Sequence, residues 1–168
     1  MTLSMYQASV PVFVRMLGNL SAFLDKATTH AEARKIDPGV LLNARLFPDM
    51  LPLAKQIQIA TDFAKGTSAR LAGIEVPKYE DNEASFAEFQ GRIQKTLAFV
   101  RSFEPAQIDG SEEREINITV AGKPMSFKGL PYLLDFALPN FYFHMTTAYN
   151  ILRHNGLEIG KRDFIGKI

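Results

Sequence analysis

Residues 131–156 read PYLLDFALPNFYFHMTTAYNILRHNG, and apolar side chains recur among them every three or four positions. That spacing places the apolar side chains on one face of an α-helix. Pro131 suits the first turn of such a helix, and Asn155-Gly156 suits its C-terminal end. The predicted inner face consists of Leu134, Leu138, Phe141, Met145, Ala148 and Leu152. A helix with one apolar face needs partner helices to cover that face.

Two segments in the first half of the chain have the same period. The first runs from about residue 5 to residue 29, and Pro11 lies near its start or kinks it. The second runs from about residue 52 to residue 71. Asp49 is a candidate N-cap for this second helix, and Gly73 is a candidate C-terminal glycine.

A third segment, from about residue 85 to residue 103, opens with Ser85-Phe86-Ala87-Glu88. This is the S-x-x-E spacing of a capping box, which marks a helix start. Asp37-Pro38 predicts a short connecting helix, because the aspartate can cap a first turn that contains proline. In the C-terminal tail we expect Phe164 and Ile165 to dock on the helices.

Before the last helix the period changes from helical to alternating. Residues 115–120 (EINITV) alternate polar and apolar, residues 121–124 (AGKP) break the pattern, and residues 125–127 (MSF) follow. This predicts a small β-hairpin, which must pack on the helices because an isolated hairpin is marginal in water. The sequence therefore predicts an all-α fold, an antiparallel four-helix bundle with one β-hairpin before the last helix.

Length and composition limit the kinds of protein that this sequence can form. The 168 residues suffice for one domain, residues 1–168, and the chain is 46% hydrophobic and 22% charged. A net charge of +1 gives no field that would attract a nucleic acid, and no segment suits a membrane span or signal peptide. The absence of cysteine excludes disulfides and thiolate chemistry, so we expect a cytoplasmic protein.

Three histidines are the candidates for chemistry. His30 follows the first helix among polar residues and is expected to be solvated, and His154 suits the last turn of the last helix. His144 lies in the middle of that helix, so it faces the core or its edge. It is either a core histidine bonded to a neighbouring carbonyl or hydroxyl, or a metal ligand or proton-transfer group.

Two further polar side chains are predicted to point inward. Gln56 shares a helix face with apolar neighbours, and Asn140 precedes His144 by one turn. Asp62 and Lys65, three residues apart, are typical of a solvated face. No pair of carboxylates lies on one apolar stripe, and no H-x-x-x-H spacing occurs, so the sequence predicts no metal site within a single helix.

The C-terminal sequence resembles a known motif. Residues 144–156 (HMTTAYNILRHNG), with Asp163-Phe164 after them, are similar to the last-helix motif of the DinB/YfiT-like superfamily of metalloenzymes. Residues 4–11 (SMYQASVP) and 58–66 (QIATDFAKG) resemble one bacterial branch of that superfamily, a family known only as a domain of unknown function. The resemblance covers nearly the whole chain.

This resemblance implies an up-down-down-up bundle, frequent homodimers and, in many members, three histidines that bind a divalent metal. Two of those histidines come from the last helix and one from the second. Here only His144 matches, because Asn140 takes the earlier last-helix position and residues 56–59 contain no histidine. Carboxamides are weak ligands for zinc or nickel, so the resemblance implies the pocket rather than an intact metal centre.

The residues leave three functions open, and they do not decide whether the protein is an enzyme. The first is a bundle that binds a small polar ligand through Gln56, Asn140 and His144, with a degenerate metal triad. The second is a divalent-metal enzyme of the DinB/YfiT type, in thiol transfer or detoxification, with His144 as ligand. The third is a structural homodimer without pocket chemistry.

Overall fold

The computed structural model describes residues 3–167, most of which are helical. Four long helices dominate: α1 (Met5–Arg34), α3 (Leu53–Ala72), α4 (Phe86–Arg101) and α7 (Leu138–His154). The shorter elements are α2 (Pro38–Leu42), α5 (Pro105–Ile108), strands β1 (Glu115–Val120) and β2 (Lys123–Lys128), α6 (Gly129–Pro131), the π-helix η1 (Tyr132–Ala137) and α8 (Lys161–Ile165).

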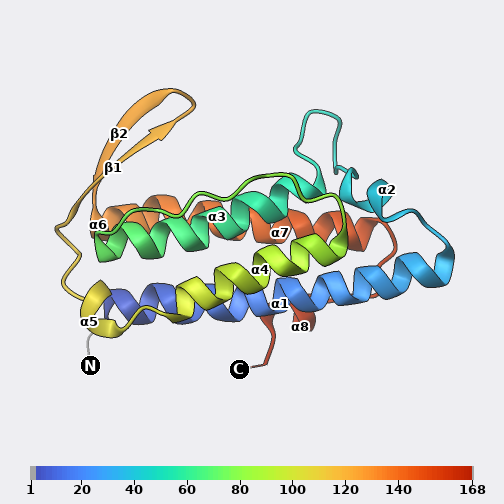
Figure 1. Cartoon of the computed structure of the whole chain (residues 1–168), viewed down its shortest axis with the longest axis horizontal. Helices are drawn as coiled ribbons and strands as arrows, with labels where there is room; N and C mark the ends of the chain where they lie inside the picture. Colours follow the sequence, from blue (N-terminus) through green and yellow to red (C-terminus); the bar gives the residue numbers. More distant parts are fainter. Residues whose placement is uncertain (1–2, 168) are drawn as a thin grey trace.

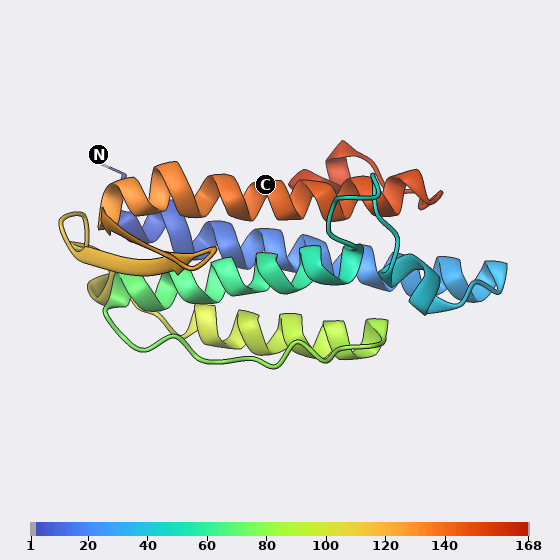
Figure 2. The ribbon, with the colours of Figure 1, turned by 90° about the horizontal axis from the view of Figure 1, so that it is seen from above.

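The long helices lie side by side along one axis (Figures 1 and 2). Figure 1 shows α1 and α7 running in one direction and α3 and α4 running in the other. Because α3 and α4 point the same way, the segment between them, residues 73–85, returns along the outside of the helices. Helix α3 packs against both α7 and α4, so its two sides face different partners.

Local capping explains most helix ends. The capping box at Ser85 and Glu88 is present as expected, and Gly73 ends α3 with a φ of 71°. Asp49 does not cap α3, so that prediction is wrong: the helix begins after Pro52, which has no side-chain oxygen to offer. Helix α1 continues to Arg34, beyond the predicted end, and its core side includes the buried Ala31.

The last helical stretch contains a π-helical turn that the sequence pattern missed. In η1 the Leu138 amide donates to the carbonyl of Leu133, five residues back. Pro139 lacks an amide hydrogen and its ring crowds the carbonyl four residues before it, which favours a wider turn there. The wider turn brings Leu133 to the inside with 0% exposure and leaves Leu134 45% exposed, so the predicted inner position of Leu134 is wrong.

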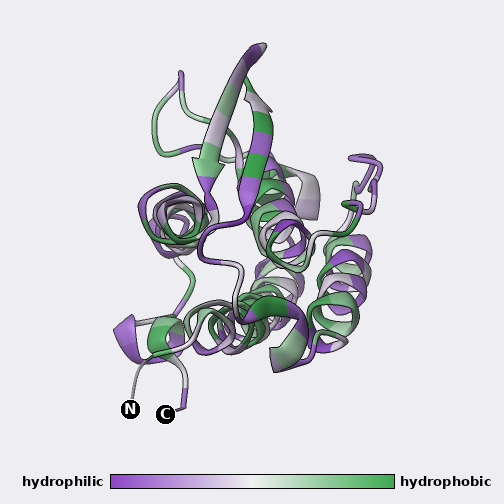
Figure 3. Cartoon of the chain, turned by 90° about the vertical axis from the view of Figure 1, so that its left-hand side faces the viewer, coloured by the Kyte–Doolittle hydropathy of each residue, from purple (hydrophilic) through white to green (hydrophobic). Residues whose placement is uncertain are grey.

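The hairpin is confirmed, with a tighter turn than expected. Strands β1 and β2 are antiparallel, and Val120 pairs with Lys123 around Ala121 and Gly122, whose φ values are 49° and 78°. Two positive φ values are typical of the turn that matches the twist of a hairpin. The expectation that Lys123 and Pro124 also break the strand is wrong. Figure 3 shows the hairpin projecting from the helices, with hydrophobic and hydrophilic residues alternating.

One apolar core fills the space between the long helices. Phe13 of α1 and Phe141 of α7 are both fully buried and meet edge to face, with ring centroids 4.9 Å apart. In the tail, Phe164 packs against Tyr149 as expected, whereas Ile165 remains 37% exposed. Among residues 3–167, no helix has the length and apolar character needed to cross a membrane.

Candidate functional site

Gln56 and His144 meet across the interface of α3 and α7. The side-chain oxygen Oε1 of Gln56 lies 2.7 Å from Nδ1 of His144. The side-chain nitrogen Nε2 of Gln56 donates to the carbonyl of Leu51, at 3.0 Å. Gln56 is buried, with 1% exposure, and His144 is half-buried. The structure therefore brings together two of the three residues that the sequence selected.

These two contacts fix the tautomer of His144. The Leu51 carbonyl can only accept, so it orients the amide group of Gln56 toward itself and turns Oε1 toward the imidazole. An amide oxygen also only accepts, so Nδ1 of His144 must carry the hydrogen. In the neutral ring the other nitrogen, Nε2, then has a free lone pair. Within the described residues no side chain or carbonyl forms a hydrogen bond with Nε2.

The surroundings keep His144 neutral. Burial lowers the pKa of His144 to about 4, because a charged imidazolium loses solvation among its neighbours. Phe63 lies nearly parallel to the imidazole, with ring centroids 6.1 Å apart, and Phe143 meets it edge-on. At neutral pH the ring therefore offers Nε2 as a hydrogen-bond acceptor.

A cleft of about 580 Å³ opens between the hairpin, α3 and the η1–α7 stretch. The hairpin rises away from these helices at one end of the molecule (Figures 1 and 3). The lining residues are Ile59, Asp62, Phe63, Arg70, Ile118, Thr119, Val120, Ala121, Tyr132, Phe136 and Asn140. The volume is in the range of small-molecule sites. Gln56 and His144 are not among the lining residues; Phe63 lies between the cleft and His144, because it lines the cleft and stacks on the imidazole.

Asn140 belongs to the cleft rather than to the Gln56–His144 pair. Its side-chain amide donates to the carbonyl of Phe136, at 2.7 Å, next to the π-helical turn. That bond leaves the amide oxygen of Asn140 available in the cleft, one helical turn from His144.

The other two histidines differ from each other. His154 is exposed in the last turn of α7, as expected. His30 lies within α1 and is half-buried. Its Nε2 is buried without a hydrogen-bond partner among residues 3–167. The prediction of a solvated His30 is wrong. Helix α1 continues beyond His30, and the chain after α7 lies close to the imidazole, with Gly156 next to the ring.

The donor set at His144 does not fit a divalent metal. The Gln56 oxygen accepts the hydrogen on Nδ1 of His144, so Nε2 is the one strong ligand atom that this pair could offer an ion. The part of the chain that the structure describes contains no group of three histidine, aspartate or glutamate side chains with metal-binding geometry. A single imidazole nitrogen beside carboxamide oxygens is a weak site for zinc or nickel.

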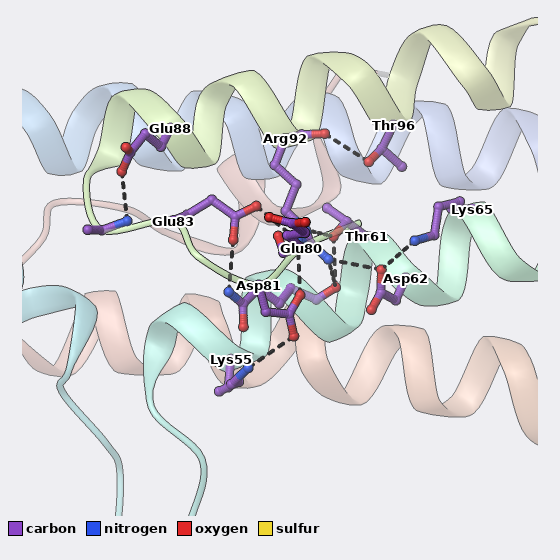
Figure 4. A network of polar contacts seen from close by, with 12 residues as sticks. Lys55, Thr61, Asp62, Lys65, Glu80, Asp81, Glu83, Glu88, Arg92 and Thr96 are labelled. Atoms are coloured by element: carbon purple, nitrogen blue, oxygen red, sulfur yellow. Dashed lines mark hydrogen bonds and ion pairs between the residues drawn. The ribbon is translucent and has the colours of Figure 1, made fainter. Parts of the chain in front are cut away.

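On the opposite side of α3, a buried arginine organises a polar network (Figure 4). The side chain of Arg92 in α4 is 2% exposed and pairs with Glu83 and Asp62, each at 2.9 Å, and with Asp81 at 3.1 Å. It also donates to the hydroxyl of Thr61, at 2.7 Å. These contacts hold the segment between α3 and α4 against both helices.

Lys65 extends the same network. Its ammonium group lies 2.9 Å from Asp62 and 3.8 Å from the centre of the Tyr79 ring. The Lys65 side chain is only 5% exposed, so the prediction of a solvated face at Asp62 and Lys65 is wrong for the lysine. The helices alone would leave that face open, but the returning segment with Tyr79 covers it.

Sequence reasoning missed Arg92, Arg70 and Phe63 as residues of polar or functional sites. Arg92 had a detectable pattern, because it follows Phe89 by three residues and precedes Thr96 by four on the buried face of α4. An acidic segment, residues 80–83, precedes that helix. Arg70 gave no comparable pattern, because its surroundings depend on where the hairpin packs.

Comparison with known proteins places the chain in a family. The model of the family described as "Domain of unknown function (DUF1993)" matches residues 5–165. A crystal structure of a DinB family member protein from Shewanella denitrificans is 42% identical, with a TM-score of 0.87, and the match covers 97% of this chain and 92% of that one. No curated protein matches. The chain therefore belongs to the DUF1993 family of DinB-like proteins, whose function is unknown.

Proposed function

We propose that this protein binds a small polar ligand in the cleft between the hairpin, α3 and α7. The observation that carries the proposal is the Gln56–His144 hydrogen bond, which leaves Nε2 of a neutral imidazole as an acceptor. Unlike Nε2 of His30, this nitrogen is not closed off from solvent, so a ligand can reach it. A ligand that donates to Nε2 and to the amide oxygen of Asn140 would use both.

The cleft supports the proposal through its composition. Phe63 and Phe136 give apolar contact area, and their rings lie 5.9 Å apart between centroids. Polar groups at Asn140 and Thr119 lie on the same cleft. A mostly apolar cleft with a few convergent polar groups is the usual form of a small-molecule site.

Ligand-detected NMR with a panel of small amides, amines, alcohols and carboxylates tests the proposal. We expect at least one compound to bind the wild type and to bind His144→Gln about fivefold more weakly, because one hydrogen bond is lost. His154→Gln, an exposed position on the same helix, is the control and should bind like the wild type. A panel without binders, or equal binding by His144→Gln, would contradict the proposal.

A divalent-metal enzyme of the DinB/YfiT type is the competing hypothesis. The Gln56 carbonyl that orients Nδ1 of His144 is the observation in its favour, since histidine ligands usually donate their second nitrogen to such an oxygen. The donor set argues against it. Elemental analysis of the purified protein separates the two, because the enzyme hypothesis requires near-stoichiometric metal and the binding hypothesis requires none.

We also infer that the four long helices form the up-down-down-up bundle of the superfamily and that two copies associate. The helix directions in Figure 1 support the first inference. The superfamily resemblance, which implies frequent homodimers, supports the second, and Phe47 at 64% and Phe143 at 56% exposure are apolar side chains that an interface could cover. Light scattering at micromolar concentration tests the association, and a monomer would contradict it.

A further inference from the structure

Arg70 places a fixed positive charge in the same cleft. Its Nη1 donates to the hydroxyl of Tyr132, at 3.1 Å, and Tyr132 is 1% exposed. The guanidinium therefore has one firm anchor and lies next to the cleft that Tyr132 and Phe136 also line.

Gly66 gives this guanidinium its position. A Cβ atom at residue 66 would lie 2.4 Å from Nη1 of Arg70, so the arginine side chain rests directly over the glycine. Glycine in the interior of a helix is unfavourable for helix stability. Its presence in α3 leaves room for the Arg70 side chain to lie flat along the helix.

Arg70 has no counter-ion from this chain. Its guanidinium forms no ion pair with any carboxylate among residues 3–167. Asp62 also lines the cleft, but the cations of Lys65 and Arg92 each lie 2.9 Å from its carboxylate. The charge of Asp62 is therefore compensated, and the charge of Arg70 is not.

We propose that Arg70 binds the carboxylate of a ligand whose apolar body lies against Phe63, Phe136 and Ile118. A guanidinium held in place is suited to a planar carboxylate, because it presents paired N–H donors in one plane. The aromatic and aliphatic lining residues of the cleft suit an aryl or alkyl body. This inference rests on the proposed function, since it uses the same cleft, and it names the chemical class of the ligand.

Benzoate, benzamide and inorganic phosphate are the probes, titrated into ¹⁵N-labelled full-length protein and followed by NMR. We expect benzoate to shift amide signals of cleft residues. Benzamide, which has the same shape without the charge, should bind at least about tenfold more weakly, because the ion pair with the guanidinium is lost and a neutral oxygen takes the place of the carboxylate. Equal binding of benzoate and benzamide overturns the role of charge, and equal binding of phosphate and benzoate overturns the role of the apolar body.

Three variants locate the binding group. Arg70→Gln should weaken benzoate binding about ten- to a hundredfold, the range expected for hydrogen bonds to a charged group. Arg101→Gln, an exposed arginine in the last turn of α4, is the matched control and should change nothing. Gly66→Ala keeps the charge and favours the helix, but displaces the guanidinium, so it should fold at least as well as the wild type and still bind benzoate more weakly. Unchanged binding by Arg70→Gln and Gly66→Ala overturns the proposal.

A titration with 4-hydroxybenzoate separates this inference from the proposed function, because its carboxylate can pair with Arg70 and its hydroxyl can donate to Nε2 of His144, which benzoate cannot do. Loss of 4-hydroxybenzoate binding in Arg70→Gln but not in His144→Gln supports the carboxylate site and contradicts the role of His144. Loss in His144→Gln but not in Arg70→Gln supports the role of His144 and contradicts the carboxylate site. Loss in both variants, with the controls intact, supports both proposals.

Discussion

The side-chain oxygen of Gln56 lies 2.7 Å from Nδ1 of His144 and links the first turn of α3 to the middle of α7. The contact replaces the convergence of three histidines that the superfamily resemblance implies. Because Leu51 fixes the orientation of the glutamine amide, the imidazole has one tautomer and one free nitrogen. A position that resembles a metal-ligand site thus becomes a hydrogen-bonding site.

The Gln56–His144 contact should be measurable as a coupling free energy. In a double-mutant cycle of Gln56→Leu and His144→Phe, chemical denaturation should give a coupling of about 1 kcal/mol, the usual net value of a hydrogen bond. Gln94→Leu, at an exposed position on α4, combined with His144→Phe should give a coupling near zero. A zero coupling for the first pair would show that the contact does not form.

The low pKa of His144 predicts a dependence of stability on pH. The unfolded state binds a proton at His144 near pH 6.5, whereas the folded state resists it down to about pH 4. The free energy of unfolding should therefore fall as the pH decreases from about 6.5 to about 4, and this part of the slope should end below that range. Denaturation curves of His144→Gln should lack the slope, while those of His154→Gln should keep it.

Arg92 should be the most sensitive polar residue for stability. Arg92→Met leaves the carboxylates of Glu83 and Asp62 without their shared cation, and removal of one partner from a buried ion-pair network costs about 3 kcal/mol. Arg101→Met, at an exposed site on the same helix, should cost less than about 0.5 kcal/mol. Limited proteolysis should also cut residues 73–85 faster in Arg92→Met; equal stability and equal cleavage would contradict this role.

The same network predicts a second acidic transition. Burial raises the pKa of Glu83, but hydrogen bonds from Arg92 and Gln58 outweigh it, so its pKa is lowered. A carboxyl group with a lowered folded pKa contributes stability above its unfolded pKa, and this contribution is lost as the pH falls through the folded value. Glu83→Gln should flatten the pH dependence of stability below about pH 4.5, the ordinary range of a glutamate. An unchanged curve would exclude Glu83 as its source.

The sequence was sufficient for features that depend on neighbouring residues. The capping box of Ser85 and Glu88, the glycine at residue 73 and the alternating hairpin strands are local patterns, and the structure confirms them. The inward position of Gln56 followed from its apolar neighbours on one helix face. Those neighbours lie within one or two turns, so helical periodicity was enough to detect them.

Features that depend on distant partners could not be derived in this way. Arg92 meets Asp62 across 30 residues of chain, and neither residue reveals the other in the sequence. The burial of Lys65 depends on the path of residues 73–85. The outward turn of Leu134 depends on a π-helical turn beside Pro139, where a regular helical period gives the wrong face. The cleft itself combines residues of the hairpin, α3, η1 and α7, which lie far apart in the sequence.

The most direct test of the account is the protonation of the His144 ring at neutral pH. Nitrogen NMR of the ¹⁵N-labelled imidazole, assigned by comparison with His144→Gln, distinguishes the two neutral tautomers and the charged form. We expect a hydrogen on Nδ1 and none on Nε2 at pH 7, with no charged form until the pH approaches about 4. A hydrogen on Nε2, or a charged ring at pH 7, would contradict the account.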